Sequence, residues 1–186
     1  MTLEPYKVAS APDYAPYKWE WGTRDQSMFA AMRGVVDHFV CLADQVDSQH
    51  RGSFTEYSGR KRSLKVAMDA IEKYERELSK ATLVGFDGIK GLGDMSKVKV
   101  YGLTDLNRLK ERDPTFAFKV KSMPDDKVVG RLWTDGGIAT RAEDFYSRAL
   151  ESYNQQTMIR ISLVHYNTLE EIGIFLKTLN KICESI

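Results

Sequence analysis

Apolar residues recur at spacings of three and four positions in the first part of the chain, a pattern typical of amphipathic helices. One series follows Asp25 and comprises Met28, Met32, Val35, Val36, Phe39, Val40 and Ala43. A second comprises Leu64, Ala67, Met68, Ile71, Tyr74 and Leu78. The polar stretch 47–62 lies between the two series. We therefore expect two long helices joined by a loop or hinge.

After the second helix the pattern changes to short, alternating runs that are typical of strands. Phe116, Phe118 and Val120 alternate with more polar residues, so we expect one face of this strand to be buried. Short β-type runs are predicted at 82–86 ("TLVGF"), 96–103 ("SKVKVYGL"), 114–121 ("PTFAFKVK"), 137–141 ("GIATR") and 158–164 ("MIRISLV"). Strand pairing across these runs predicts a small sheet.

Helix signals separate the later strands. Ser122 and Asp125 have the spacing of a capping box, and Gly136 and Gly137 are expected to end the helix that follows. The buried stripe predicted for that helix comprises Val128, Val129, Leu132 and Trp133. Another helix is predicted at 143–153.

The last helix has a clear start and a clear apolar face. Thr168 and Glu171 have the spacing of a second capping box. The residues predicted to be buried on this helix are Ile172, Phe175, Leu176, Leu179 and Ile182.

These elements predict an α+β fold, with a small, mostly antiparallel sheet covered on one face by helices, over residues 56–186. Residues 1–55 are predicted to form a separate part, an extended arm followed by a helix. The arm carries Pro5, Pro12 and Pro16 among five aromatic residues, with no sustained period. Such a stretch needs a larger surface to lie against.

The composition of the chain argues against several classes of partner. The chain has 186 residues, 42% of them hydrophobic and 28% charged, with a formal net charge of +1. The small net charge gives no reason to expect nucleic acid or an anionic membrane as a partner. No apolar run approaches the roughly 18 residues of a membrane span. Cys41 and Cys183 are the two cysteines and lack metal-like spacing, which suits reduced thiols in a cytoplasmic protein.

Few residues present recognisable catalytic chemistry. His38, His50 and His165 are far apart in sequence, so no metal site is predicted. Arg160 alternates with the apolar residues of its strand, and Arg141 ends the preceding one. An arginine on a strand offers a planar fork that binds a carboxylate bidentately, but it is also common on a solvated sheet face. The residues alone leave both readings open.

The segment "WEWGTRD" at residues 19–25 raises a similar choice. Gly22 and Thr23 stand directly before a predicted helix, where a small hydroxyl residue often marks the helix start. The same pair could form half of a phosphate site, because a helix N-terminus favours anions.

The order of these segments resembles the C-terminal part of class V aminotransferase-like enzymes, which use pyridoxal phosphate on the type I fold. The group includes cysteine desulfurases, selenocysteine lyases and isopenicillin N epimerase-like proteins. The most specific segment is "RISLVHYNTLEEI" at 160–172, followed by "EWGTRD" at 20–25. The weaker segments "VYG", "FAF" and "GIATR" lie between these two segments, in the order found in the family. The resemblance therefore spans nearly the whole chain.

The resemblance implies roles for four residues. Arg160 falls on the arginine of the family pattern R-x-S-L-x-x-Y-N, which binds the substrate α-carboxylate. Arg141 falls on an arginine before the active-site loop and is carried over as a second substrate-binding residue. Gly22 and Thr23 would contact the cofactor phosphate of the other subunit of a homodimer. The implied substrate is an amino acid, and the implied chemistry is that of a lyase, an aminotransferase or an epimerase.

Two departures from the family pattern shape the expectation. Residues 142–153 hold no cysteine, so sulfur transfer through a thiol at that place is not expected. The family also needs a lysine that bonds to the cofactor aldehyde, usually placed just after a histidine, and the chain has no His-Lys pair. We therefore expect no catalytic residue in this chain.

A large cofactor-binding domain of roughly 250 residues is also expected in such an enzyme. The chain then reads as a C-terminal portion, with residues 1–55 a remnant of that large domain. By itself it is expected to be inactive and to bind no pyridoxal phosphate. The alternative is a free-standing α+β binding or regulatory module without catalysis. Some 200 further residues with a His-Lys motif ahead of Thr2 would favour the enzyme, and a natural start at Met1 would favour the module.

Overall fold

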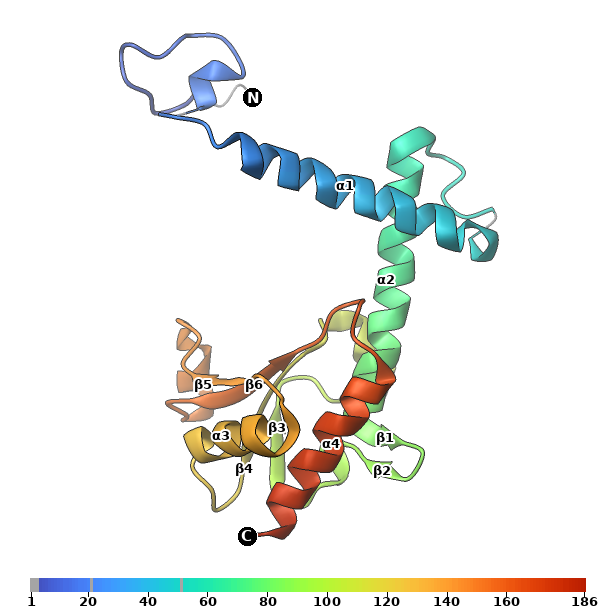
Figure 1. The fold of residues 1–186 in the computed structure, drawn as a ribbon, viewed down its shortest axis with the longest axis vertical. Coiled ribbons are helices and arrows are strands. Elements are labelled where there is room, and N and C mark those ends of the chain that lie inside the picture. The colour runs from blue at the N-terminus through green and yellow to red at the C-terminus, as the bar shows by residue number, and fades with distance from the viewer. Residues whose placement is uncertain (1–3, 21, 51) are drawn as a thin grey trace. The chain divides into compact units, whose positions relative to one another are not determined.

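The computed structural model describes residues 4–20, 22–50 and 52–186. The chain forms two compact units, Met1–Met68 and Asp69–Ile186, and one long helix contributes to both. The helices are α1 (Gln26–Val46), α2 (Gly59–Val84), α3 (Asp125–Gly136) and α4 (Leu169–Glu184) (Figure 1). The strands are β1 (Gly85–Phe86), β2 (Ile89–Lys90), β3 (Val98–Tyr101), β4 (Thr115–Val120), β5 (Arg141–Glu143) and β6 (Met158–Ser162). The predicted α+β class is confirmed.

In the first unit, α1 begins where the sequence predicts. Asp25 is its N-cap, and its carboxylate accepts hydrogen bonds from the backbone N–H groups of Ser27 (2.9 Å) and Met28 (3.3 Å). The C-terminal half of α1 packs on the first turns of α2, where Ala43, Val66 and Ala67 are buried. In the predicted loop at 47–62, the last four residues already belong to α2 and Arg51 lies outside the described residues; the other residues agree with the prediction.

The residues before α1 carry local structure. A short 3₁₀ helix spans Tyr17–Trp19, and Lys7 forms an ion pair with Asp13 at 2.9 Å. Residues 1–3 and Trp21 of the predicted arm lie outside the described residues.

The second unit is built on a four-stranded sheet with the order β3-β4-β6-β5, in which all neighbours pair antiparallel. The prediction of a mostly antiparallel sheet is therefore confirmed. A separate hairpin, β1-β2, follows α2. The predicted strand at 82–86 is wrong for its first three residues, because α2 continues to Val84. Thr82 is buried, and its hydroxyl donates to the Leu78 carbonyl at 2.8 Å, so this polar group is satisfied within the helix. The helix gives way at Gly85, which has φ 76°.

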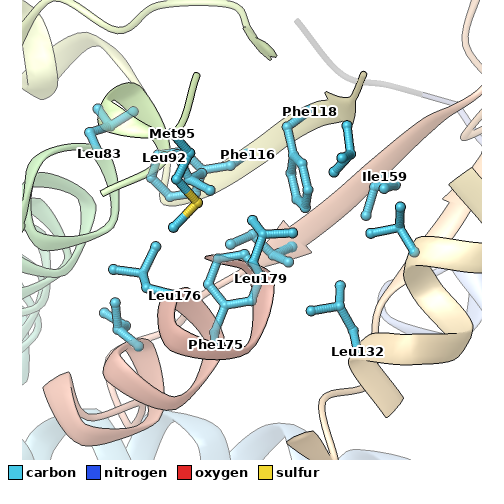
Figure 2. Close-up of a cluster of buried hydrophobic side chains, with 14 of the residues drawn as sticks. Leu83, Leu92, Met95, Phe116, Phe118, Leu132, Ile159, Phe175, Leu176 and Leu179 are labelled. Carbon is cyan, nitrogen blue, oxygen red and sulfur yellow. The ribbon is translucent and has the colours of Figure 1, made fainter. Parts of the chain in front are cut away.

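The main core lies between one face of the sheet and the helices. Phe116, Phe118 and Ile159 point from β4 and β6 toward Leu132 of α3 and toward Phe175, Leu176 and Leu179 of α4 (Figure 2). The predicted alternation of β4 is confirmed, since its apolar residues Phe116, Phe118 and Val120 are buried. The Phe118 and Phe175 rings meet edge to face with centroids 6.1 Å apart. The other face of the sheet is thereby left for the loops and the polar strand residues.

Two predictions for α3 are wrong. Ser122 is not its cap: it lies in a turn with φ 66°, and the N-cap position is Pro124, which makes no side-chain cap. Asp125 is instead buried, where its carboxylate pairs with Lys119 at 2.9 Å and accepts the Thr157 hydroxyl at 2.8 Å. The Asp125 side chain therefore forms a tertiary ion pair and not the local capping box.

The stripe predicted for α3 is buried in part. Val128 and Leu132 are buried, but Trp133 is 62% exposed, because it follows Leu132 around the helix and turns away from the sheet. The predicted helix end is confirmed: α3 ends at Gly136, and Gly137 caps it with φ 66° in the left-handed region that favours glycine.

The region between α3 and β6 departs most from prediction. Of the strand predicted at 137–141 only Arg141 is in a strand, and β5 runs on to Glu143. The helix predicted at 143–153 is a 3₁₀ helix over Arg148–Tyr153, preceded by a turn. The reason lies in that turn, where Phe145 and Tyr146 have φ 55° and 54°, which no right-handed helix allows.

The last helix, α4, agrees with prediction. Thr168 and Glu171 form the expected capping box: the Thr168 hydroxyl accepts the Glu171 N–H at 3.2 Å, and Glu171 accepts the Thr168 N–H at 2.8 Å. All five residues predicted to be buried on this helix are buried.

Candidate functional site

The two arginines singled out from the sequence are brought together by the sheet. Arg141 of β5 and Arg160 of β6 are directly opposite each other in the antiparallel register. Directly opposed residues on one sheet face have their Cβ atoms about 4.5–5.5 Å apart, and like charges there destabilise the pair. Neither guanidinium has an ion pair with any of the residues that the structure describes. The two guanidiniums therefore carry positive charges that no ion pair with a described residue neutralises.

Arg160 lies on the sheet face away from the helices. Its strand neighbours Ile159 and Ile161 are buried in the main core, so the alternation of the strand places Arg160 on the opposite face. The sequence prediction that Arg160 projects from the face opposite these residues agrees with this burial pattern. Arg160 itself is half-buried.

A small second cluster covers part of that face. Tyr101, Leu150 and Met158 are buried together, and Phe145 packs against them. The guanidinium carbon Cζ of Arg160 lies 4.4 Å from the centroid of the Phe145 ring, a cation–π contact. Sequence reasoning missed Phe145, because a single aromatic residue in a turn gives no periodic signal.

A cleft of about 580 Å³ opens at this edge of the second unit. Both arginines contribute to its lining, as does Thr140, whose hydroxyl is buried with no hydrogen-bond partner among the described residues. Apolar residues of β6 and α4, including Leu163 and Phe175, line another part. The cleft thus combines an apolar wall with two arginines and an unpaired hydroxyl, and Glu171 adds one carboxylate to its lining.

The turn between β6 and α4 is held by a polar network at the rim of the cleft. Asn167 accepts the Val164 N–H at 2.9 Å and donates to Glu171 at 3.2 Å, and its carbonyl accepts the Tyr74 hydroxyl at 2.8 Å. The Thr168 N–H, with further help from Asn167, holds the pKa of Glu171 below its ordinary value. Glu171 is therefore charged near neutral pH and engaged locally.

Gly22 and Thr23, the predicted phosphate contacts, lie in the first unit. Gly22 has φ 62°, and a Cβ there would meet nothing within 4 Å, so this backbone stands open to an approaching group. Thr23 is exposed. The N–H groups of Ser27 and Met28 at the start of α1 are already taken by Asp25. Any anion at this place would therefore use Gly22 and Thr23 themselves.

Other chemistries find less support in the described residues. Within 4–20, 22–50 and 52–186 no three His, Cys, Asp or Glu residues lie together as metal ligands would. Over the same residues, no helix is both long and apolar enough to span a membrane. Cys183 is buried, which raises the pKa of its thiol, and Cys41 is exposed in the first unit.

Comparison with known proteins decides the family. The model of the class-V aminotransferase family matches residues 62–175, which is more than half of the chain. The chain belongs to the class-V aminotransferase family. The matched region includes β3 to β6 and most of the rim of the cleft, so the resemblance predicted from the sequence is confirmed.

Individual relatives agree with this assignment. A probable cysteine desulfurase of Borreliella burgdorferi is 30% identical over 124 residues, covering 65% of this chain and 27% of that protein. An aminotransferase-like protein of Gibberella zeae is 29% identical over 122 residues, covering 63% of this chain and 29% of that protein. The chain therefore spans less than a third of the length of these relatives.

The fold agrees with a solved structure. The apo cysteine desulfurase from Thermococcus onnurineus aligns with a TM-score of 0.55 and 23% identity, over 68% of this chain and 29% of that chain. At this identity the match shows a shared fold. The α+β architecture is thus that of part of a class-V aminotransferase-type enzyme.

Proposed function

We propose that the chain supplies the small domain of a pyridoxal-phosphate-dependent enzyme that acts on an amino acid. The reaction would be that of a selenocysteine lyase- or cysteine desulfurase-like lyase, or of an aminotransferase. Membership of the class-V aminotransferase family supports the cofactor. The observation that carries the proposal is the pair of uncompensated guanidiniums of Arg141 and Arg160, in register at a cleft. A bound anion would neutralise the charge of such a pair.

Arg160 would bind the α-carboxylate of the substrate. Its planar fork matches a carboxylate through two parallel N–H···O bonds, and charged pairs of this kind are about twice as strong as neutral ones. Two such bonds fix the direction of the Cα–carboxyl bond, and so orient the other bonds of the substrate at Cα. Arg141 would add a second positive charge and so strengthen the electrostatic attraction of the site for the carboxylate.

Gly22 and Thr23 would contribute to the cofactor phosphate of the other subunit in a homodimer. The open backbone at Gly22 admits an anion close to the main chain, and Thr23 offers a hydroxyl and a backbone N–H. These donors fit a phosphate, and because Asp25 occupies the N-cap of α1, the phosphate would be held by Gly22 and Thr23 and not by the first N–H groups of the helix. When bound, pyridoxal phosphate supplies an electron sink for bonds broken at Cα.

The segment after Arg141 bears on the type of chemistry. A cysteine desulfurase passes sulfur to a thiol, but residues 142–153 hold no cysteine. Cys183 is buried among residues of the main core. We therefore do not assign thiol-mediated sulfur transfer to this segment, and elimination at Cβ, amino transfer and epimerisation stay within the proposal.

The central test follows the Arg160 guanidinium by NMR in the 186-residue chain labelled with ¹⁵N-arginine. The probe is N-acetyl-L-alanine, and the matched neutral compound is N-acetyl-L-alaninamide, at equal ionic strength. We expect the Arg160 Nε–H signal to shift saturably with the acid and not with the amide. Arg160→Lys identifies the signal by removing it.

A control arginine makes the test specific. Arg148 is 91% exposed and already pairs with Glu151 at 3.2 Å, so its signal should respond only weakly and without saturation. Equal responses from Arg148 and Arg160 would show ordinary ion pairing on a solvated face and would contradict the proposal. With pyridoxal phosphate alone we expect no stable new absorbance band, because the chain has no His-Lys pair; such a band would contradict the assignment of the lysine to another domain.

A further inference from the structure

The turn after β5 places an aromatic ring against the Arg160 guanidinium. Phe145 follows β5 by two residues, and its ring centroid lies 4.4 Å from Arg160 Cζ. A guanidinium that lies on an aromatic ring uses its flat face, while its N–H groups point outward in its own plane. A stacked contact at this distance would leave the hydrogen-bonding edge available for a carboxylate.

The backbone at Phe145 is held in a conformation that few residues adopt. Phe145 and Tyr146 both lie in the left-handed region, at φ 55° and 54°. For residues other than glycine such conformations are unfavourable and persist where the surroundings impose them. Asp144 supplies part of that constraint: its carboxylate accepts the Tyr146 N–H at 2.9 Å, and its carbonyl accepts the Ser147 N–H at 3.1 Å.

The strained turn gives its two aromatic residues different surroundings. Phe145 packs against the cluster of Tyr101, Leu150 and Met158, next to Arg160. Tyr146 is 98% exposed, although it shares the same backbone conformation. The turn thus directs one ring onto the sheet beside the arginine and the other into solvent.

We propose that Phe145 is a positioning residue for Arg160, holding its guanidinium flat so that the N–H edge faces an incoming substrate carboxylate. The inference rests on the proposed function of Arg160. Without the Phe145 ring, repulsion from Arg141, which lies directly opposite, would drive the Arg160 side chain away from the sheet. The ring opposes that movement and leaves the positive charge of Arg160 in place. A neighbouring carboxylate would neutralise that charge.

The first measurement tests the contact itself and needs no ligand. In the ¹⁵N-arginine-labelled 186-residue chain, the Arg160 Nε–H proton should be shifted upfield by the ring current of Phe145. Phe145→Leu and Phe145→Met, two non-aromatic replacements of similar volume, should both remove this shift. Phe145→Tyr should retain it, and Tyr146→Leu, the matched control, should leave it unchanged.

The second measurement tests positioning. Titration with N-acetyl-L-alanine should give an affinity at Arg160 that falls about two- to fivefold in Phe145→Leu and Phe145→Met, the range expected for an exposed cation–π contact. Phe145→Tyr and Tyr146→Leu should stay within about twofold of the wild type on the same scale. Rescue by tyrosine separates an aromatic contact from general damage to the turn.

The outcomes separate this inference from the proposed function. A wild-type response that Phe145→Leu and Phe145→Met leave unchanged overturns the positioning role alone. An equal loss in Tyr146→Leu also overturns it, because the effect would then belong to the turn and not to the ring. Absence of any wild-type response to the acid overturns the carboxylate role of Arg160 and the inference with it, even where the ring-current shift is present.

Discussion

Replacing Arg141 by glutamate gives the sharpest energetic test of the paired arginines. Arg141 and Arg160 are opposite each other in the register of β5 and β6, with no ion pair to another described residue. Arg141→Glu removes a like-charge contact and creates an attractive one at the same place. The chain should therefore become more stable, although a charge has been reversed at a proposed binding site.

The magnitude follows from the exposure of the pair. Arg141 is exposed and Arg160 is half-buried, so solvent screens their interaction strongly. Removing a cross-strand repulsion and adding an attraction each contribute about 0.2–0.5 kcal/mol at such a place. The expected gain is about 0.5–1 kcal/mol in the free energy of unfolding, or about 2–5 °C in Tm for a unit of this size. Arg141→Gln, which removes only the repulsion, should give about half of the gain.

Urea unfolding followed by circular dichroism measures the effect, at low ionic strength and in 1 M NaCl. The gain should shrink at high salt, where the screening length falls to about 3 Å. Arg148→Glu is the control, because it breaks the pair with Glu151 and should destabilise slightly. An Arg141→Glu variant that is less stable than the wild type, or whose gain does not depend on salt, would refute the reasoning from the register.

Three further changes test the fold around the site. Phe118→Ala should lower the free energy of unfolding by about 3–5 kcal/mol, as measured by urea titration, because Phe118 is fully buried at the centre of the main core. Gly91→Ala should abolish or severely reduce folding, read by circular dichroism, because the new Cβ would lie 2.3 Å from the Leu83 carbonyl oxygen. Glu171 has a lowered pKa, so its contribution to stability is complete above its ordinary pKa and is lost as pH falls through the folded-state value. Glu171→Gln, which removes the titrating carboxyl group, should therefore weaken the acid dependence of stability in urea titrations between pH 6 and 3, a range that brackets the ordinary carboxyl pKa of about 4.3.

Each of these has a clear contrary result. A loss below about 1 kcal/mol for Phe118→Ala would mean that the sheet face is not packed as described. The control is Gly130→Ala, where a Cβ would meet nothing within 4 Å and φ is not positive. Stability of Gly91→Ala equal to that of the wild type and of this control would contradict the close approach of Gly91, directly after β2, to Leu83 of α2. An acid dependence that Glu171→Gln leaves unchanged would mean that the lowered pKa of Glu171 does not contribute to stability.

The sequence predicted those elements whose signals are local. Phe116, Phe118 and Val120 alternate because β4 has one buried face, and Thr168 with Glu171 caps α4 without help from elsewhere. Ser122 and Asp125 had the same spacing but formed no box, because Lys119 and Thr157 bind the Asp125 carboxylate in the folded chain. A spacing rule describes what neighbours could do, and tertiary partners decide whether they do it.

The candidate site shows the same division. Arg160 and its sheet face could be predicted from alternation and from the family resemblance, but its pairing with Arg141 depends on register between strands separated by a turn and a 3₁₀ helix. The ring of Phe145 could not be placed at all, because the left-handed turn that directs it has no glycine to signal it. The boundary between Met1–Met68 and Asp69–Ile186 likewise falls inside a continuous helix that shows no break in pattern.

The central claim, that Arg160 is an anchor for a carboxylate, is tested most directly by its chemical reactivity. Phenylglyoxal modifies free guanidiniums, and mass spectrometry of the digested chain gives a modification rate for each arginine. The account predicts that N-acetyl-L-alanine slows modification of Arg160 severalfold, that N-acetyl-L-alaninamide does not, and that the rate at Arg148 is the same with either compound. Equal rates at Arg160 with and without the acid would contradict it.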